Sequence, residues 1–219
     1  MNERSFISVT FMPTTPLDPA LERREQILRA AMVCFARRGF HQTSMHDISA
    51  EAGISVGLIY RYFENKDAVI SAMADEHKRE IHEVLERARL APSLREAFEI
   101  IFTWHCCENT PHVVAAFVVD LFAEAGRNPR VADLVRDVGA TAKVGVTDLI
   151  ARSPEASQLP GEIDPEDVAE MIFAVNDGLL MRDVLAPSRS IEERRERQLT
   201  VARNLWSLLF KHEHESALS

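Results

Sequence analysis

Long hydrophobic runs are scarce in this chain of 219 residues. The longest, VVAAFVV at positions 113–119, ends at Asp120. A membrane-spanning helix needs about 20 predominantly apolar residues, so the sequence argues against a membrane protein. Residues 1–18 also lack the apolar segment and small-residue cleavage site of a secretory signal, and we expect them to form a flexible arm.

Cysteine is rare as well, with only Cys34, Cys106 and Cys107. Three cysteines provide no evenly paired, spaced disulfide framework, which favours a reducing, cytoplasmic location. Regulation by oxidation of the adjacent pair is an alternative. However, neighbouring helical residues point about 100° apart, and a disulfide between them would be strained.

Motifs for catalysis or metal binding are missing. The sequence has no G-x-S-x-G elbow, no P-loop and no strand with paired carboxylates. His105-x-x-Glu108 and His212-x-His214 lack further ligands at coordinating spacing. We therefore expect no metal, no cofactor and no enzymatic activity. A helical enzyme and a helical adaptor that binds no DNA are the alternatives.

Positive charge is in short supply, with 25 basic against 34 acidic residues and a net charge of −9. The deficit is unevenly distributed. Residues 20–66 carry seven basic and five acidic side chains, a net charge of +2, whereas the chain from residue 67 onward has a net charge of −10. This asymmetry indicates a small unit that faces a polyanion, attached to an acidic body.

Helix signals cover almost the whole chain. A capping side chain followed by proline at the first helical position marks starts at 18–19, 110–111, 128–129 and 164–165. Capping boxes begin at Ser93 and Ser190, and Asn65 can cap a further helix. We predict an all-α fold of about nine helices: 19–38, 45–52, 55–62, 66–89, 94–108, 111–126, 129–152, 165–186 and 191–211.

The segment GISVGLIYRYFENK at 53–66 follows a short helix that ends at Gly53. Ser55 can cap the next short helix, and Ile59 and Phe63 can turn inward toward the longer first helix. Two short helices joined by a tight glycine turn form a helix-turn-helix, whose second helix enters the major groove of DNA. A tight corner between helices of an ordinary helical domain is the alternative.

The helix-turn-helix interpretation assigns roles to individual side chains. Gly57 would allow close approach to a phosphate, Val56 would contact a thymine methyl, and Arg61 would reach a guanine edge or a phosphate. Lys66 would contact the DNA backbone from the start of the following helix. Two further hydroxyl groups come from Tyr60 and Tyr62.

QTSMHDISAEAGISVGLIYRYFENKDAVISAM, at 42–73, resembles the DNA-binding signature of the tetracycline-repressor (TetR) family, which with the first helix covers about residues 21–81. The resemblance implies an all-helical homodimer that binds a near-palindromic double-stranded DNA operator and usually represses until a small molecule binds. Leu58 stands where many relatives have a small or hydroxylated residue, so a phosphate hydrogen bond is missing there. The implied DNA-facing positions are Thr43, Ser44, Val56, Gly57, Leu58, Tyr60, Arg61, Tyr62 and Lys66.

The same resemblance implies a DNA-binding module at 19–66, a ligand-binding and dimerisation body at 67–212 and a tail at 213–219. The last two helices would form a four-helix dimer interface, although a core within one chain would produce the same apolar stripes. The expected interface residues are Ile172, Val175, Leu179, Leu199, Ala202, Leu205, Trp206 and Leu209.

The body combines aromatic residues with a few polar groups inside apolar helices, which predicts a pocket between the fifth, sixth and eighth helices. The ligand would be a small apolar or aromatic molecule, with a cation possible if Asp120 points inward. Each polar residue also has a plainer interpretation, as a partnered core group or part of a solvated stripe. The expected lining residues are Trp104, His105, Phe117, Asp120, Phe173 and Asn176.

Overall fold

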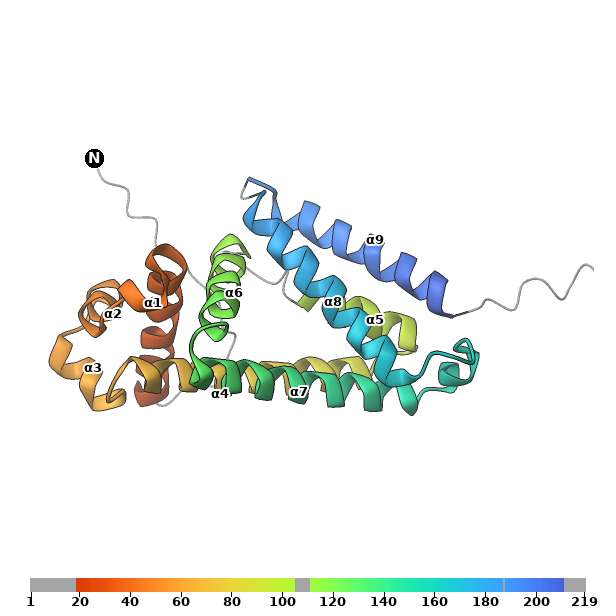
Figure 1. Ribbon diagram of the computed structural model, residues 1–219, viewed down its shortest axis with the longest axis horizontal. Helices are drawn as coiled ribbons and strands as arrows, with labels where there is room; N and C mark the ends of the chain where they lie inside the picture. The colour runs from red at the N-terminus through yellow and green to blue at the C-terminus, as the bar shows by residue number, and fades with distance from the viewer. Residues whose placement is uncertain (1–18, 105–110, 187, 211–219) are drawn as a thin grey trace, which may run out of the picture. The chain divides into compact units, whose positions relative to one another are not determined.

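The computed structural model describes residues 19–104, 111–186 and 188–210, and within these ranges its regular structure is entirely helical, as predicted (Figure 1). None of the described helices is both long and apolar enough to cross a lipid bilayer. A short 3₁₀ helix, η2, spans Pro154–Gln158. The α-helices are α1 (Pro19–Gln42), α2 (Met45–Glu51), α3 (Val56–Tyr62), α4 (Lys66–Arg89), α5 (Leu94–Thr103), α6 (Pro111–Ala125), α7 (Pro129–Ala151), α8 (Pro165–Val184) and α9 (Ile191–Leu209).

Local capping chemistry explains why several helices begin where they do. The hydroxyl of Ser55 accepts a hydrogen bond from the Leu58 N–H at the start of α3, and Asn65 caps α4 through the Ala68 N–H. Ser190 forms a full capping box with Glu193 at the start of α9. These predicted caps are therefore confirmed.

The chain divides into two compact units that do not follow the expected order along the sequence. The first unit comprises the described residues of Met1–His77, Glu108–Arg136 and Asp183–Pro187. The second comprises the described residues of Lys78–Cys107, Asp137–Arg182 and Ser188–Ser219. Helix α6 and the start of α7 thus belong with the helix-turn-helix segment. The functional division at residue 66 stays a prediction.

The first unit has a core built around α1, with α1, α2 and α3 grouped together (Figure 1). Ile27, Ile48 and Ile59 are fully buried in it. Phe117 of α6 stacks on Phe35 of α1, with ring centroids 6.2 Å apart. Phe117 was predicted to line the effector pocket, and its ring, which is partly buried, packs against the core of the first unit.

The second unit has its own core, to which α5, α8 and α9 all contribute. Trp206 of α9 stacks on Phe210 with centroids 4.1 Å apart and meets Phe98 of α5 edge-on at 5.5 Å. Glu99 of α5 accepts a hydrogen bond from Arg203 Nε of α9 at 2.9 Å. Apolar packing between these helices therefore forms the centre of this unit.

The apolar stripes of α8 and α9 lie mainly inside this core. Five of the residues expected at a dimer interface are buried within the single chain: Ile172, Leu179, Ala202, Trp206 and Leu209. Val175 and Leu205 are partly buried against the same core, and Leu199 is half-buried. Of the two alternatives left open by the sequence, the structure thus places these side chains in an intramolecular core.

Candidate nucleic-acid interface and effector site

The turn between α2 and α3 depends on one glycine. Gly53 has a φ of 67°, a left-handed conformation that residues with a Cβ adopt at a cost. Ser44 accepts from the Asp47 N–H at 3.1 Å, and Asp47 in turn accepts from the Ser44 N–H at 2.9 Å. The cap and the glycine fix α2 and its turn, and through them the start of α3.

One face of α3 is exposed while the opposite side is buried through Ile59. Tyr60 is 53% exposed, and Gly57 and Arg61 are also exposed. No atom lies within 4 Å of the position that a Cβ of Gly57 would occupy. A polyanion can therefore approach the backbone at this point. Half-buried neighbours border the same face: Val56, Leu58 and Tyr62.

Thr43 was expected to contact DNA, but its side chain is buried and bonded within the protein. It is only 2% exposed, and its hydroxyl donates to the carbonyl oxygens of Gly39 at 2.9 Å and Cys34 at 3.2 Å. Its hydroxyl hydrogen satisfies carbonyls near the end of α1, so no donor is left for a phosphate. Ser44 is exposed, although its hydroxyl also donates to Asp47 Oδ2 at 2.6 Å.

Lys66 was also expected at the DNA backbone, but its ammonium group points into the first unit. Nζ donates to the carbonyl oxygens of Phe40 and Thr43, the latter at 2.9 Å, and lies 4.3 Å from the centroid of the Phe40 ring. Burial lowers the pKa of Lys66. The carbonyls that follow the kink of α1 hold this cation because a helix end attracts positive charge.

Two acids of α6 hold the same turn from another side. Gly39 interrupts α1 with φ 78° and ψ 162°, and the next N–H, that of Phe40, donates to Asp120 Oδ2 at 2.9 Å. Asp120 therefore belongs to the first unit, where its carboxylate holds the turn at the end of α1. The possibility of a cationic ligand depended on Asp120 pointing inward, and this basis is lost.

Glu124, one helical turn later, has a fully buried side chain. It accepts from Arg127 Nε at 2.9 Å and Asn128 Nδ2 at 3.1 Å, and His41 Nε2 lies 2.9 Å from its Oε2. Burial alone would raise the pKa of Glu124, but the hydrogen bonds from Asn128 and Arg127 and the charge of His41 hold it below its ordinary value. Glu124 is therefore a buried acid with partners and not part of a solvated stripe.

The expected effector pocket is only partly assembled. Trp104, Phe173 and Asn176 do come together in the second unit, around an inner cavity of about 40 Å³. His105, Cys106 and Cys107 lie outside the described residues. The inner cavity would hold about one water molecule and is far smaller than the 300–1,000 Å³ typical of small-molecule sites.

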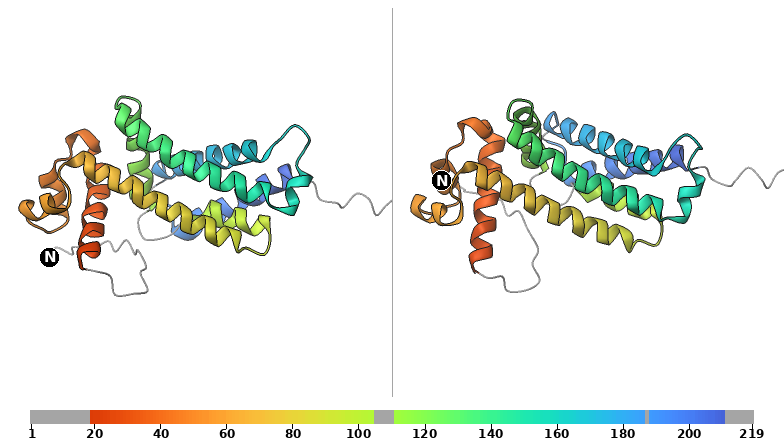
Figure 2. Two further views of the ribbon diagram at one scale, coloured as in Figure 1. Left: turned by 90° about the horizontal axis from the view of Figure 1, so that it is seen from below. Right: turned by 60° about the horizontal axis from the view of Figure 1, so that its bottom comes forward.

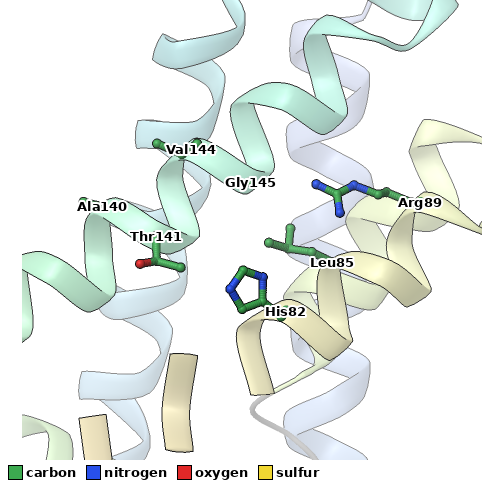
Figure 3. A pocket seen from close by; sticks show the side chains of 7 residues that line it. All are labelled: His82, Leu85, Arg89, Ala140, Thr141, Val144 and Gly145. Carbon is green, nitrogen blue, oxygen red and sulfur yellow. The ribbon is translucent and has the colours of Figure 1, made fainter. Parts of the chain in front are cut away.

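A larger hollow lies beside it, between the parts of α4 and α7 that run next to each other in the second unit (Figure 2). This outer groove has a volume of about 400 Å³. Figure 3 shows Thr141 of α7 opposite His82 of α4, and Gly145 of α7 opposite Leu85. No pattern in the sequence had indicated this groove. Its lining is His82, Leu85, Arg89, Ala140, Thr141, Val144 and Gly145.

Two family models match the sequence. Residues 27–73 match the model of bacterial regulatory proteins of the tetR family, and residues 108–207 match the C-terminal model of BetI-type transcriptional repressors. The HTH-type transcriptional regulator TtgR of Pseudomonas putida is 30% identical over 194 residues. This similarity covers 78% of the present chain and 84% of TtgR.

Solved structures share the fold. GusR of Salmonella enterica superimposes with a TM-score of 0.69 at 26% identity, covering 87% of this chain and 98% of GusR. The fatty acid degradation regulator FadR of Bacillus halodurans gives a TM-score of 0.74 at 21% identity, covering 88% and 97%. The arrangement of helices is therefore one that transcriptional regulators use.

Proposed function

Because the chain belongs to the tetR family of bacterial regulatory proteins, and is thus a DNA-binding transcriptional regulator, we propose that it is a repressor released from its operator by a small molecule. The observation that carries this proposal is the exposed face of α3, with Gly57, Tyr60 and Arg61 presented by a capped helix on a buried base. Its operator would lie on the chromosome, which places the protein in the cytoplasm.

The DNA-binding surface that we propose is narrower than the family positions suggest. Arg61 would contact a base edge or a phosphate, Tyr60 would donate its hydroxyl, and Gly57 would admit the DNA backbone. Thr43 and Lys66 act from within, by holding the turn that precedes α2. The bordering residues complete the surface: Ser44, Val56, Leu58 and Tyr62.

Membership of the tetR family also supports a homodimer that binds a near-palindromic operator. One helix-turn-helix reads one half-site, and two half-sites lie about 34–36 Å apart, or a multiple of that spacing. The predicted interface stripes of α8 and α9 are mainly buried within one chain, but other apolar side chains on these two helices are exposed. These exposed side chains support a contact between two copies of the chain. They include Met171 and Met181 on α8 and Leu208 on α9.

Release by an effector requires that the ligand bind the DNA-incompetent state more tightly than the competent one. Coupling of about 1–3 kcal/mol corresponds to a 5- to 150-fold loss of operator affinity. Helix α4 is the lever we propose, because its first residues belong to the first unit and its last residues to the second. The effector would be a small, largely apolar molecule bound in the second unit.

Operator capture from fragmented genomic DNA tests the proposal. The wild-type protein should enrich a small set of near-palindromic fragments, and the variant Arg61→Ala should lose this enrichment while remaining folded. Arg136→Ala, which removes an exposed arginine of α7, is the matched control and should enrich the same fragments. Enrichment of no sequence by the wild type would refute the proposed function, and equal enrichment by Arg61→Ala would show that α3 is not the reading element.

A further inference from the structure

The inner cavity and the outer groove of the second unit share one side chain. Leu85 of α4 lines both, with the groove of about 400 Å³ on one side and the cavity of about 40 Å³ on the other. It is only 4% exposed, so it fills the space between them. A leucine side chain exchanges between staggered rotamers, and its rotation would connect the two spaces.

Gly145 of α7 provides the room that Leu85 occupies. A Cβ at position 145 would lie 2.1 Å from Leu85 Cδ1, far closer than two carbon atoms can approach. The clash involves the end of a flexible side chain, so the leucine would have to move rather than the helices. Leu85 therefore lies against Gly145 at the border between the groove and the cavity, where a change of its rotamer needs no backbone change.

The chemistry of the groove is asymmetric (Figure 3). The α4 side places His82 and Arg89 on either side of Leu85, whereas the α7 side contributes only uncharged residues. Val144 stands at its rim with 69% of its surface exposed. Among the described residues that line the groove there is no acidic side chain.

Arg89 is already partly paired, because Nη1 contacts Glu86 and Nη2 lies 3.6 Å from Asp148. A guanidinium group has five N–H donors, so these contacts leave donors for a further acceptor. An anionic group beside Arg89 would form charge-assisted hydrogen bonds, which are about twice as strong as neutral ones.

We propose that the groove between α4 and α7 binds an apolar molecule carrying a single anionic group, and that Leu85 is its gate to the inner cavity. The anionic group lies between Arg89 and His82. The apolar part displaces Leu85 and reaches the surfaces of Trp104 and Phe173. This inference rests on the proposed function, since it names the ligand class and the entrance of the effector site.

Calorimetry with three probes of equal chain length tests the ligand class. Decanoate should bind the full-length protein more tightly than decanol, and decyltrimethylammonium should bind weakest. Arg89→Gln should weaken decanoate about tenfold while leaving decanol unchanged. Arg152→Gln is the matched control, because Arg152 also pairs with Asp148 but lies outside the groove. Decanoate that fails to bind at about 1 mM, or binds Arg89→Gln as well as wild type, overturns the proposal.

A double-mutant cycle tests the gate. Gly145→Ala should change decanoate affinity and thermal stability in the wild-type background, because its methyl group displaces Leu85. In the Leu85→Ala background the same substitution should leave decanoate affinity unchanged and should only raise thermal stability, because alanine favours a helix more than glycine does. Equal effects in both backgrounds would overturn the gate. Genomic operator capture separates the two proposals. If Arg89→Gln captures operators normally and binds decanoate like the wild type, the groove proposal alone is refuted. If the wild type captures no operator, the proposed function is refuted.

Discussion

The two compact units treat their buried polar groups differently. In the first, the buried Thr43 hydroxyl donates to the Gly39 carbonyl before α2, and the buried Glu124 carboxylate accepts from Asn128 and lies beside His41 Nε2. In the second, the buried oxygens Thr147 Oγ1 and Gln198 Oε1 have no hydrogen-bond partner among the described residues. Fully satisfied polar networks fix one conformation, whereas incomplete ones leave alternatives within reach.

The two hollows described above both lie in the second unit, and Leu85 lines both of them. The comparison teaches that one part of the chain is built to present a fixed surface and the other to accommodate a change.

The largest loss of stability is expected for Lys66→Met. The substitution keeps the apolar stem but leaves the carbonyls of Phe40 and Thr43 without their donor, at a cost of about 1–3 kcal/mol. Urea unfolding measures the change. Arg61→Met, on the exposed face of α3, should alter stability by less than about 0.5 kcal/mol. If Lys66→Met is as stable as the wild type and its DNA binding only loses salt dependence, Lys66 contacts the DNA backbone after all.

Two glycines of the helix-turn-helix make a matched pair. Gly53→Ala should destabilise the fold by about 1–2 kcal/mol, since its φ of 67° is left-handed. Gly57→Ala meets no neighbouring atom and should leave stability unchanged while weakening operator binding. Thermal unfolding and a DNA titration of both variants separate the effects. Equal destabilisation by the two would contradict the assigned backbone roles.

We expect low pH to destabilise the first unit by protonating Glu124. Its folded pKa lies below the ordinary value of 4.5, so its stabilisation is present above that pH and is lost as pH falls through the folded pKa. Glu124→Gln should cost about 1 kcal/mol at neutral pH and remove this part of the acid dependence. Stability measured against pH checks both. A variant with the wild-type acid profile would show that another carboxyl group is responsible.

The smallest effect concerns Cys34. Burial, followed by the nearby charges of Glu51 and Asp47, raises its pKa to about 11. In a Cys106→Ser, Cys107→Ser background, the thiol should therefore react with iodoacetamide at pH 8 far more slowly than in the urea-unfolded chain. Its raised pKa also contributes stability that is present below about pH 9 and lost as pH rises toward 11. Rapid alkylation of the folded chain would indicate an open core.

The sequence predicted what depends on near neighbours along the chain. The caps at Ser55 and Ser190 involve residues three positions apart, so pattern alone located those helix starts. The sequence did not show which side chains pack against one another. Phe117 lies in a helix that is apolar on most sides, and its periodicity could not show that it faces Phe35.

The missed parts of the site depend on contacts distant in sequence. The acceptors that bind Lys66 are backbone carbonyls, which no residue type reveals. Gly145 did carry a signal, because glycine inside a long helix is unfavourable and calls for a packing reason. That reason, Leu85, lies sixty positions earlier in the chain and emerges only from the fold.

We propose that the exposed face of α3 recognises the operator sequence. The rest of the first unit fixes the position of this face. Titration of a captured operator with Arg61→Ala, across a series of salt concentrations, tests it most directly. We expect a loss of about 1–3 kcal/mol in operator affinity or a smaller salt slope, with the unfolding midpoint unchanged. Wild-type affinity and salt slope in both Arg61→Ala and the combined variant Gly57→Glu, Tyr60→Ala, Arg61→Ala would contradict the account.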